Sequence, residues 1–367
     1  MRVAQASSLC ARSVIWDYSR GAFRSCHATL PVRTGEKTPG MPDTCTLGVD
    51  IGGTKVAAGL VDSSGEILHH TRVPMISHED AAAGLRAVET AIRAVFAAHP
   101  EETAPDRLAG IGVCSPGPLD PRAGVVINPP NLPCWRNFPL AAELHRLFHL
   151  PIHVDNDANA AGLAEAVWGQ AKGFRYVFYA TLGTGIGTGI ILDRQIYYGR
   201  TGSAGEGGHL TIDYRGPQCA CGKRGCIEAM AAGPAIAARA RQRLAEPRPS
   251  KSKILELAGG DPAQVTAEIV GEAFRKGDAL ASEVLLETAD LLTVWLGDII
   301  NLLEPEVIVF GGGVAPLIST FFGHMRAQLP RWSYNQRCQE IPLLLGRYGA
   351  DAGIAGAAAL CQAVSPG

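Results

Sequence analysis

Residues 47–62 read LGVDIGGTKVAAGLVD, and this stretch decides the fold. Two runs of small and β-branched apolar residues are separated by a pair of glycines. The pattern predicts a strand, a glycine turn and a second strand. Residues 176–193 repeat it, since an apolar run ends in the glycine-rich stretch GTGIGTG and a further strand follows. A strand, turn and strand in two places predicts an internal duplication at the level of architecture.

The remainder of the chain alternates strand and helix patterns. Further strands are predicted at 66–73, 109–114, 152–154 and 307–310, and helices at 80–98, from Asn156 onward, and at 228–246, 263–303 and 352–363. The proline-rich segment 129–139 predicts an irregular loop. Mixed strands and helices predict an α/β fold of two lobes, with the cleft between them as the default ligand site.

The composition excludes several classes of function. The chain has 367 residues, 47% of them hydrophobic, which is enough for a sizeable core. Its formal net charge of −2 gives no electrostatic argument for binding nucleic acid or an anionic membrane. No apolar run approaches the length of a membrane span, and most of the ten cysteines are scattered along the chain. We therefore expect a cytoplasmic protein that binds neither nucleic acid nor membrane.

The first 43 residues differ in kind from the others. They contain several Arg and Ser, few acids and no periodic apolar pattern, and they lack the continuous apolar core of a signal peptide. Their composition allows a transit peptide. We favour a disordered tail, or a start at Met41, which precedes the first strong strand. Residues 44–154, with a C-terminal helix at 352–365, are then assigned to a small lobe and residues 155–351 to a large lobe.

Residues 206–228 read EGGHLTIDYRGPQCACGKRGCIE. One histidine and three cysteines form a complete tetrahedral shell for Zn²⁺, and a closed shell predicts a structural metal. The predicted ligands are His209, Cys219, Cys221 and Cys226. The alternatives are disulfides, which are typical of short secreted chains, and a zinc knob remote from any site. Glu206 and Glu228 bracket the cluster, and two carboxylates fixed in this way predict a polar binding site.

Three glycine clusters predict a nucleotide site. Glycines at a hairpin tip let backbone N–H groups approach an anion. Beside the first turn, Thr54 adds a hydroxyl, Lys55 a positive charge, and Asp50 a carboxylate that can hold Mg²⁺ directly or through water. The predicted nucleotide-binding residues are Asp50, Gly52, Gly53, Thr54, Lys55, Gly183, Thr184, Gly185, Gly311, Gly312 and Gly313. A lone glycine hairpin is usually only a turn, and neither a Walker A loop nor a dinucleotide fingerprint fits the chain.

Residues 155–159 read DNDAN and run from a strand into a helix. Asp and Asn are good helix caps, which is the simple explanation, but one cap needs only one side chain. Asn156 and Asp157 together offer donors and acceptors suited to adjacent sugar hydroxyls. The carboxylate of Asp157 can also accept a proton from an attacking alcohol. The helix N-terminus is expected to lower the pKa of this carboxyl and keep it ionised.

These segments together resemble the ROK family (repressor, open reading frame, kinase), most closely its bacterial glucokinases. The resemblance covers nearly everything from Leu47 to the C-terminus. It rests on the order and combination of the motifs DIGGTK, DNDAN, LGTGIG, EGGH, CACGKRGCIE and GGGV. It implies the actin-like, ribonuclease H-like ATPase fold, with ATP and a sugar in the cleft between two lobes.

The resemblance also implies roles for single residues. Asp157 matches the catalytic base, and His209 serves the zinc through one ring nitrogen and the sugar through the other. The implied sugar contacts are Gly117, Asn131, Asn156, Asp157, Glu206, His209 and Glu228. The implied activity is ATP- and Mg²⁺-dependent phosphorylation of a hexose at its 6-hydroxyl, and D-glucose is the hexose that the resemblance favours. The resemblance also implies a homodimer.

Two alternatives stay open within the resemblance. One is a kinase for another hexose: N-acetylglucosamine, N-acetylmannosamine, allose or fructose. The other is a sugar-responsive transcriptional repressor, which would carry an added winged helix-turn-helix. The residues before the first strand are few for such a module and show no pair of amphipathic helices.

Overall fold

The computed structural model describes residues 44–247 and 252–362. The disordered tail or late start expected at 1–43 lies outside these described residues, and so do positions 363–365 of the expected C-terminal helix. Within the described ranges, no helix combines the length and the apolar character that crossing a bilayer requires.

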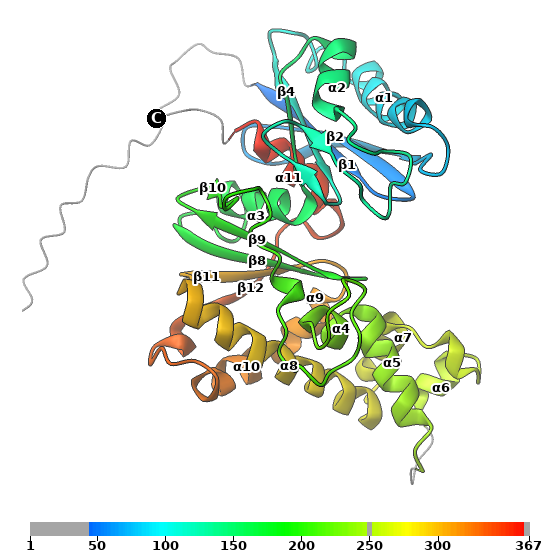
Figure 1. The fold of residues 1–367 in the computed structure, drawn as a ribbon, viewed down its shortest axis with the longest axis vertical. Coiled ribbons are helices and arrows are strands. Elements are labelled where there is room, and N and C mark those ends of the chain that lie inside the picture. Colours follow the sequence, from blue (N-terminus) through cyan, green and yellow to red (C-terminus); the bar gives the residue numbers. More distant parts are fainter. Residues whose placement is uncertain (1–43, 248–251, 363–367) are drawn as a thin grey trace, which may run out of the picture. The chain divides into compact units, whose positions relative to one another are not determined.

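Two mixed sheets with the same strand order form the framework of the described residues (Figure 1). The first has the order β3-β2-β1-β4-β7, comprising β1 (Cys45–Ile51), β2 (Lys55–Val61), β3 (Ile67–Pro74), β4 (Leu108–Ser115) and β7 (Ile152–Asn156). The second has the order β10-β9-β8-β11-β12, comprising β8 (Tyr176–Leu182), β9 (Ile186–Leu192), β10 (Gln195–Ile196), β11 (Val307–Gly311) and β12 (Leu343–Leu345).

The pairing of the strands confirms the predicted duplication. In each sheet the first three strands form an antiparallel meander, and two parallel strands extend the other side of its first strand. Each glycine turn therefore follows the first strand of its sheet, at equivalent places. The turns are closed by backbone hydrogen bonds from Gly52 N to Lys55 O at 2.8 Å and from Gly183 N to Gly185 O at 2.9 Å.

Two helices of small residues lie between the sheets (Figure 1). Helix α3 (Asp157–Val167) packs on β8 and β9, helix α11 (Ala352–Leu360) packs on β1 and β4, and the two helices contact each other. A β-carbon on Gly356 would lie 2.6 Å from the backbone of Ala160, and one on Gly112 would lie 1.7 Å from the carbonyl oxygen of Ala357. Glycine is required at these contacts because the backbones approach so closely. The boundary between lobes at residue 154 stays a prediction.

The outer faces of the sheets are covered by amphipathic helices, with a buried apolar cluster under each layer. Helices α1 (Ala81–Ala98) and α2 (Leu140–Phe148) cover the first sheet. The second carries α4 (Ile227–Ala231), α5 (Gly233–Leu244), α6 (Lys253–Leu257), α7 (Ala267–Arg275), α8 (Ala279–Leu303), α9 (Ala315–Ile318) and α10 (Phe322–Gln328). Trp295 of α8 meets Phe178 of β8 edge-on, with ring centroids 5.6 Å apart. The predicted α/β class is therefore confirmed.

The two long helices expected at 228–246 and 263–303 are each broken. The second breaks because Gly277 adopts a φ of 75°, and Asp278 then caps α8 by accepting a hydrogen bond from the N–H of Ala281 at 2.8 Å. The first breaks at Ala232, whose extended backbone separates α4 from α5. Helix α2 and strand β12 were not anticipated, because each is short, and α2 directly follows the proline-rich segment.

Candidate active site

The segment DNDAN lies where β7 turns into α3. Asn156 caps the helix, since its Oδ1 accepts hydrogen bonds from the N–H groups of Ala158 at 2.9 Å and Asn159 at 3.3 Å. Asp157 is the first residue of the helix. The simple capping explanation therefore accounts for Asn156, and Asp157 Oδ1 accepts a further hydrogen bond from the N–H of Ala158 at 2.8 Å.

A cavity of about 140 Å³ opens above this helix start. Asn156, Asp157, Gly117 and Glu206 all line it, although they are far apart in the sequence. Gly117 comes from the loop after β4, and Glu206 precedes the short 3₁₀ helix Gly207–His209. The fold therefore brings four of the predicted sugar contacts into one space.

The pKa of Asp157 differs from the expectation. The surrounding protein restricts its hydration although its side chain is exposed to the cavity, and this burial raises the pKa of Asp157 to about 6. The N–H of Ala158 acts in the opposite direction, while the negative charges of Asp50 and Glu206 add to the rise. The helix N-terminus was expected to lower the pKa of Asp157. The net shift is upward, so that prediction is wrong. A pKa of about 6 still leaves the carboxyl mostly ionised at pH 7.

Asp50 lies at the end of β1 and interacts electrostatically with Asp157. Burial raises the pKa of Asp50, and the thiol of Cys114, 3.5 Å from its Oδ1, and the charge of Lys55 oppose the rise. Helix α11 begins directly beside it, because a β-carbon on Gly353 would lie 2.3 Å from the Asp50 carboxyl carbon. Two neighbouring carboxylates with raised pKa values form the kind of oxygen-rich set that suits a divalent cation.

The first glycine turn holds the predicted residues Gly52, Gly53, Thr54 and Lys55, of which Thr54 and Lys55 are exposed. Asn131 packs against this turn, since a β-carbon on Gly53 would lie 2.8 Å from its carbonyl oxygen. Among the described residues, Asn131 is not one of those that line the 140 Å³ cavity. The structure thus brings Asn131 to the first turn, and its role as a sugar contact stays a prediction.

The second turn and the third glycine cluster meet at another cavity, of about 450 Å³. Gly183, Thr184 and Gly313 line it, and a β-carbon on either glycine would meet open space. The other predicted glycines serve packing instead. Gly185 faces Glu228, Gly311 faces the ring of Tyr179, and Gly312, with a φ of 83°, faces the carbonyl of Leu182.

Sequence reasoning missed the remaining wall of this cavity. Gly233, Pro234 and Arg241 contribute from α5, and Thr266 and Glu268 from the start of α7. The Gly-Pro pair that opens α5 is the one signal that could have drawn attention to them, because proline is favoured in the first turn of a helix.

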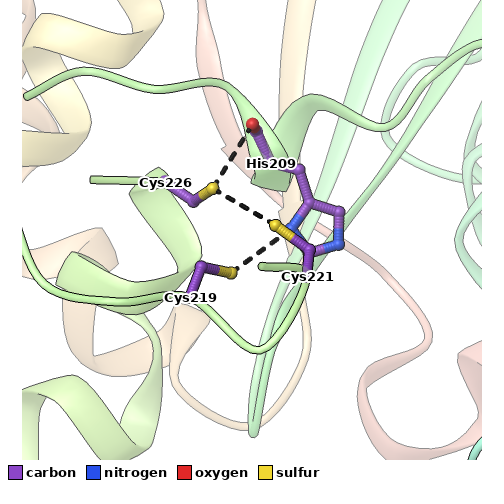
Figure 2. Close-up of side chains that lie close together, drawn as sticks. All are labelled: His209, Cys219, Cys221 and Cys226. Carbon is purple, nitrogen blue, oxygen red and sulfur yellow. Dashed lines mark hydrogen bonds between the residues drawn. The ribbon is translucent and has the colours of Figure 1, made fainter. Parts of the chain in front are cut away.

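The four predicted metal ligands converge (Figure 2). Their ligand atoms all lie within 4.8 Å of one another, with Cys219 Sγ 3.7 Å from His209 Nδ1 and Cys221 Sγ 3.6 Å from Cys226 Sγ. A tetrahedral Zn²⁺ with Zn–S bonds of about 2.3 Å requires ligand spacings of about 3.7 Å. The donor set therefore fits zinc, and the thiols are free of disulfides.

The cluster is joined directly to the 140 Å³ cavity. Glu206 lines the cavity and its carbonyl accepts a hydrogen bond from His209 N at 3.1 Å. Glu228 lies 3.8 Å from His209 Nδ1 and accepts a hydrogen bond from Ile186 N at 2.9 Å, beside the second turn. Figure 2 shows the other ring nitrogen of His209 on the side away from the thiols. The cluster therefore lies beside the cavity that four of the predicted sugar contacts line, which counts against a zinc knob remote from any site.

A larger cavity, of about 570 Å³, adjoins the first one. It is lined by β7, β10 and the loop around Arg122, and it shares Asp155 and Pro121 with the 140 Å³ cavity. None of the predicted site residues lines it. The candidate site is therefore not this larger cavity. It is the smaller cavity, because predicted acidic residues and Gly117 come together there.

Solved structures share this architecture. The ROK family glucokinase from Streptomyces griseus, crystallised with glucose and AMPPNP, matches 87% of this chain and 99% of its own with a TM-score of 0.73 and 32% identity. A ROK family transcriptional regulator, a homologue of the E. coli MLC protein, matches 88% of this chain and 79% of its own with a TM-score of 0.76 and 28% identity. The fold and the site define an ATP-dependent sugar kinase with the actin-like ATPase fold.

The chain belongs to the ROK family, whose sequence profile matches residues 46–364. The glucokinase of Thermotoga maritima is 32% identical over 323 residues, which cover 88% of this chain and 98% of the relative. The N-acetylmannosamine kinase of Escherichia fergusonii is also 32% identical, over 86% of this chain and 98% of the relative. The family, the fold and the hexose kinase activity are thus confirmed, while relatives that act on different sugars are equally similar.

Proposed function

We propose that this ROK kinase transfers the γ-phosphoryl group of ATP to the 6-hydroxyl of D-glucose. One observation carries the proposal: a single cavity joins Asp157, Asn156, Gly117 and Glu206 beside the His/Cys cluster. Carboxylates accept hydrogen bonds and do not donate them when ionised, so this cavity suits a ligand rich in hydroxyl donors. An unmodified hexose meets that requirement.

Asp157 acts as the general base. Its pKa of about 6 lies near physiological pH, where a base can be both ionised and able to take a proton. The attacking hydroxyl gives its proton to the Asp157 carboxylate as the oxygen approaches the γ-phosphorus. Because the transition state of phosphoryl transfer is loose, alignment of the hydroxyl contributes more than its activation.

The nucleotide lies between the two glycine turns. The 450 Å³ cavity suits the adenosine, with Arg241 and Glu268 as polar groups on its wall. Backbone N–H groups of the two turns other than those of Gly52 and Gly183, which close the turns, then approach the phosphates. Mg²⁺ would be held at Asp50 and would neutralise charge on the phosphates when bound. The orientation of Asp50 is set by Cys114 and by the start of α11.

The His/Cys cluster holds a structural Zn²⁺. Burial raises the pKa of Cys226 to about 12, and a divalent cation would supply the opposing charge that three clustered thiolates need. Zinc would fix His209 and, through the 3₁₀ helix that ends at this residue, Glu206. Trp295 Nε1 also donates to the carbonyl of Gly207 at 3.0 Å, which ties this segment to the core.

A coupled ADP-release assay over a panel of hexoses tests the proposal. The panel contains D-glucose, D-fructose, D-allose, N-acetylglucosamine and N-acetylmannosamine, with ³¹P NMR to locate the new phosphate. The highest kcat/KM is expected for glucose, with the phosphate on the 6-hydroxyl. A preference for N-acetylmannosamine would refute the assignment of glucose. It would favour the sugar in the name of an equally similar relative. Size-exclusion chromatography with light scattering tests the expected homodimer.

A further inference from the structure

Tyr198 connects two distant segments that line the hexose cavity, and the mechanism above does not use it. It follows β10 and begins the loop that leads to Glu206, and residues 201–206 of this loop line the cavity. The hydroxyl of Tyr198 donates a hydrogen bond to Asp155 Oδ2 at 2.5 Å, across 43 positions of the chain. Asp155 also lines the cavity, and it directly precedes Asn156 and Asp157. The hydrogen bond therefore joins the loop of Glu206 to the segment that carries the proposed base.

The Asp155 carboxylate holds the start of α3. Its residue is only 2% exposed. Its Oδ1 accepts hydrogen bonds from Asn156 N at 2.7 Å and from Asn159 Nδ2 at 3.1 Å. These two donors stand on either side of Asp157 in the chain. The orientation of the Asp155 carboxylate thus bears directly on the backbone from which the base projects.

Tyr198 holds the other oxygen of this carboxylate. Hydrogen bonds to an ionised group are strong, so a carboxylate that accepts them at both oxygens resists rotation about its Cβ–Cγ bond. Burial raises the pKa of Asp155, and the hydrogen bonds from Tyr198, Asn159 and Asn156 N oppose the rise. Loss of the Tyr198 hydroxyl would leave Oδ2 buried without this donor, which is unfavourable enough to let the carboxylate turn.

The loop itself is fixed by other hydrogen bonds. The N–H of Tyr197 donates to Ile190 O at 2.8 Å, and the carbonyl of Tyr198 accepts a hydrogen bond from Ala204 N at 3.2 Å. Directly before Glu206, the carbonyl of Gly205 accepts a hydrogen bond from the hydroxyl of Thr188. Removal of the Tyr198 hydroxyl should therefore disturb Asp155 while the loop keeps its path.

We propose that Tyr198 is a positioning residue for phosphoryl transfer, whose hydroxyl fixes the Asp155 carboxylate and thereby the orientation of the Asn156–Asp157 segment. The inference rests on the proposed function, because it needs Asp157 as the general base. Phosphoryl transfer depends mainly on alignment of the reacting groups. The contribution of Tyr198 is therefore expected in kcat rather than in the KM of either substrate.

A double-mutant cycle tests the inference. The kcat and KM of wild type, Tyr198→Phe, Asp155→Asn and the double variant are measured with the hexose that the panel identifies as the best substrate. Misplacement of a reacting group by 1 Å costs about 100-fold, so the smaller shift in Tyr198→Phe should lower kcat about tenfold and leave both KM values within about twofold. Asp155→Asn removes the charge that strengthens the Tyr198 hydrogen bond. In that background, Tyr198→Phe should therefore lower kcat by less than about threefold.

Tyr197→Phe is the matched control, because it removes the same hydroxyl group from the neighbouring residue, which is 49% exposed. It should keep the wild-type kcat. Calorimetry counts the hexose bound per chain in each variant, and an unchanged stoichiometry shows that a lower kcat does not come from a smaller folded fraction.

Three results would overturn the inference: a wild-type kcat in Tyr198→Phe, a raised hexose KM at constant kcat, or equal losses in the wild-type and Asp155→Asn backgrounds. Asp157→Asn, assayed in parallel, separates this inference from the proposed function. Near-normal turnover of Asp157→Asn would overturn both, because Asp157 would not be the base. An impaired Asp157→Asn beside an unimpaired Tyr198→Phe would overturn only the role of Tyr198.

Discussion

Replacement of Asp157 by Asn is the sharpest test of the proposed chemistry. The substitution keeps the size of the side chain and an oxygen that can accept the N–H of Ala158, 2.8 Å away in the native protein. Asn156, not Asp157, caps α3, so the helix should stay intact. Removal of one charge also relieves the repulsion from Asp50 and Glu206 that contributes to the raised pKa of Asp157. We therefore expect an unchanged or slightly higher melting temperature.

The expected loss of activity follows from the role of the base. Loss of a general base costs about 10²–10⁴ in rate, or about 3–5 kcal/mol in the barrier. With a pKa of about 6, the wild-type carboxyl is ionised in roughly nine molecules of ten at pH 7 and in roughly one of ten at pH 5. The wild-type rate therefore falls as the pH decreases through 6, while the amide that replaces this carboxyl in the variant does not titrate. The ratio of wild-type to variant kcat/KM should shrink by about tenfold from pH 7 to pH 5.

The measurement is the ADP-release assay at several pH values, with hexose affinity from calorimetry. Asp106→Asn is the matched control, because Asp106 is exposed in the loop before β4. The Asp157→Asn protein should bind the hexose within a few-fold of wild type. A kcat/KM within about threefold of wild type at pH 7, or a ratio that does not change with pH, would refute the assignment of Asp157 as the base.

Three further predictions concern the groups around this acid. Cys221→Ser should remove the metal, lower the melting temperature and raise the hexose KM by about tenfold, because loss of a group that orients a metal site typically costs about that factor in affinity or activity. Elemental analysis that finds no zinc in the wild-type protein would contradict the zinc assignment. Gly185→Ala should raise the hexose KM with little change in the ATP KM, because the new β-carbon would lie 2.5 Å from Glu228 Oε2 and displace that carboxylate; a larger effect on ATP than on hexose would count against this route. Asp50→Asn should raise the Mg²⁺ concentration for half-maximal rate by at least about tenfold while zinc content stays constant, and an unchanged Mg²⁺ titration would remove Asp50 from that role.

Local patterns predicted the parts of the site that are local in the fold. Each glycine turn is a hairpin that closes on itself, so residues 47–62 and 176–193 contain all the information that sets it. The ligands His209, Cys219, Cys221 and Cys226 lie within eighteen positions of one another, and their spacing alone limits how they can meet. The same reasoning explains why α3 was expected to begin near Asn156, because a helix cap is formed by neighbours in the chain.

The parts that the sequence could not predict depend on contacts between distant segments. Arg241 and Thr266 reach the 450 Å³ cavity only because α5 and α7 pack beside the second sheet. Asn131 belongs to a loop that no periodic pattern restrains, and the loop brings it to Gly53.

The pKa of Asp157 shows most clearly why local reasoning is insufficient. The helix N-terminus does act on this carboxyl, and the N–H of Ala158 lowers its pKa as expected. Burial and the charges of Asp50 and Glu206 outweigh that effect, and these two acids lie on separate segments of the fold. The result suits the chemistry better than the expectation did, because a carboxylate with a strongly lowered pKa is a weak base. The same crowding of acids favours neutral, hydroxyl-rich ligands. Under the proposed function, this crowding disfavours an anionic sugar phosphate, and the charge that positions the substrate would then also promote release of the product.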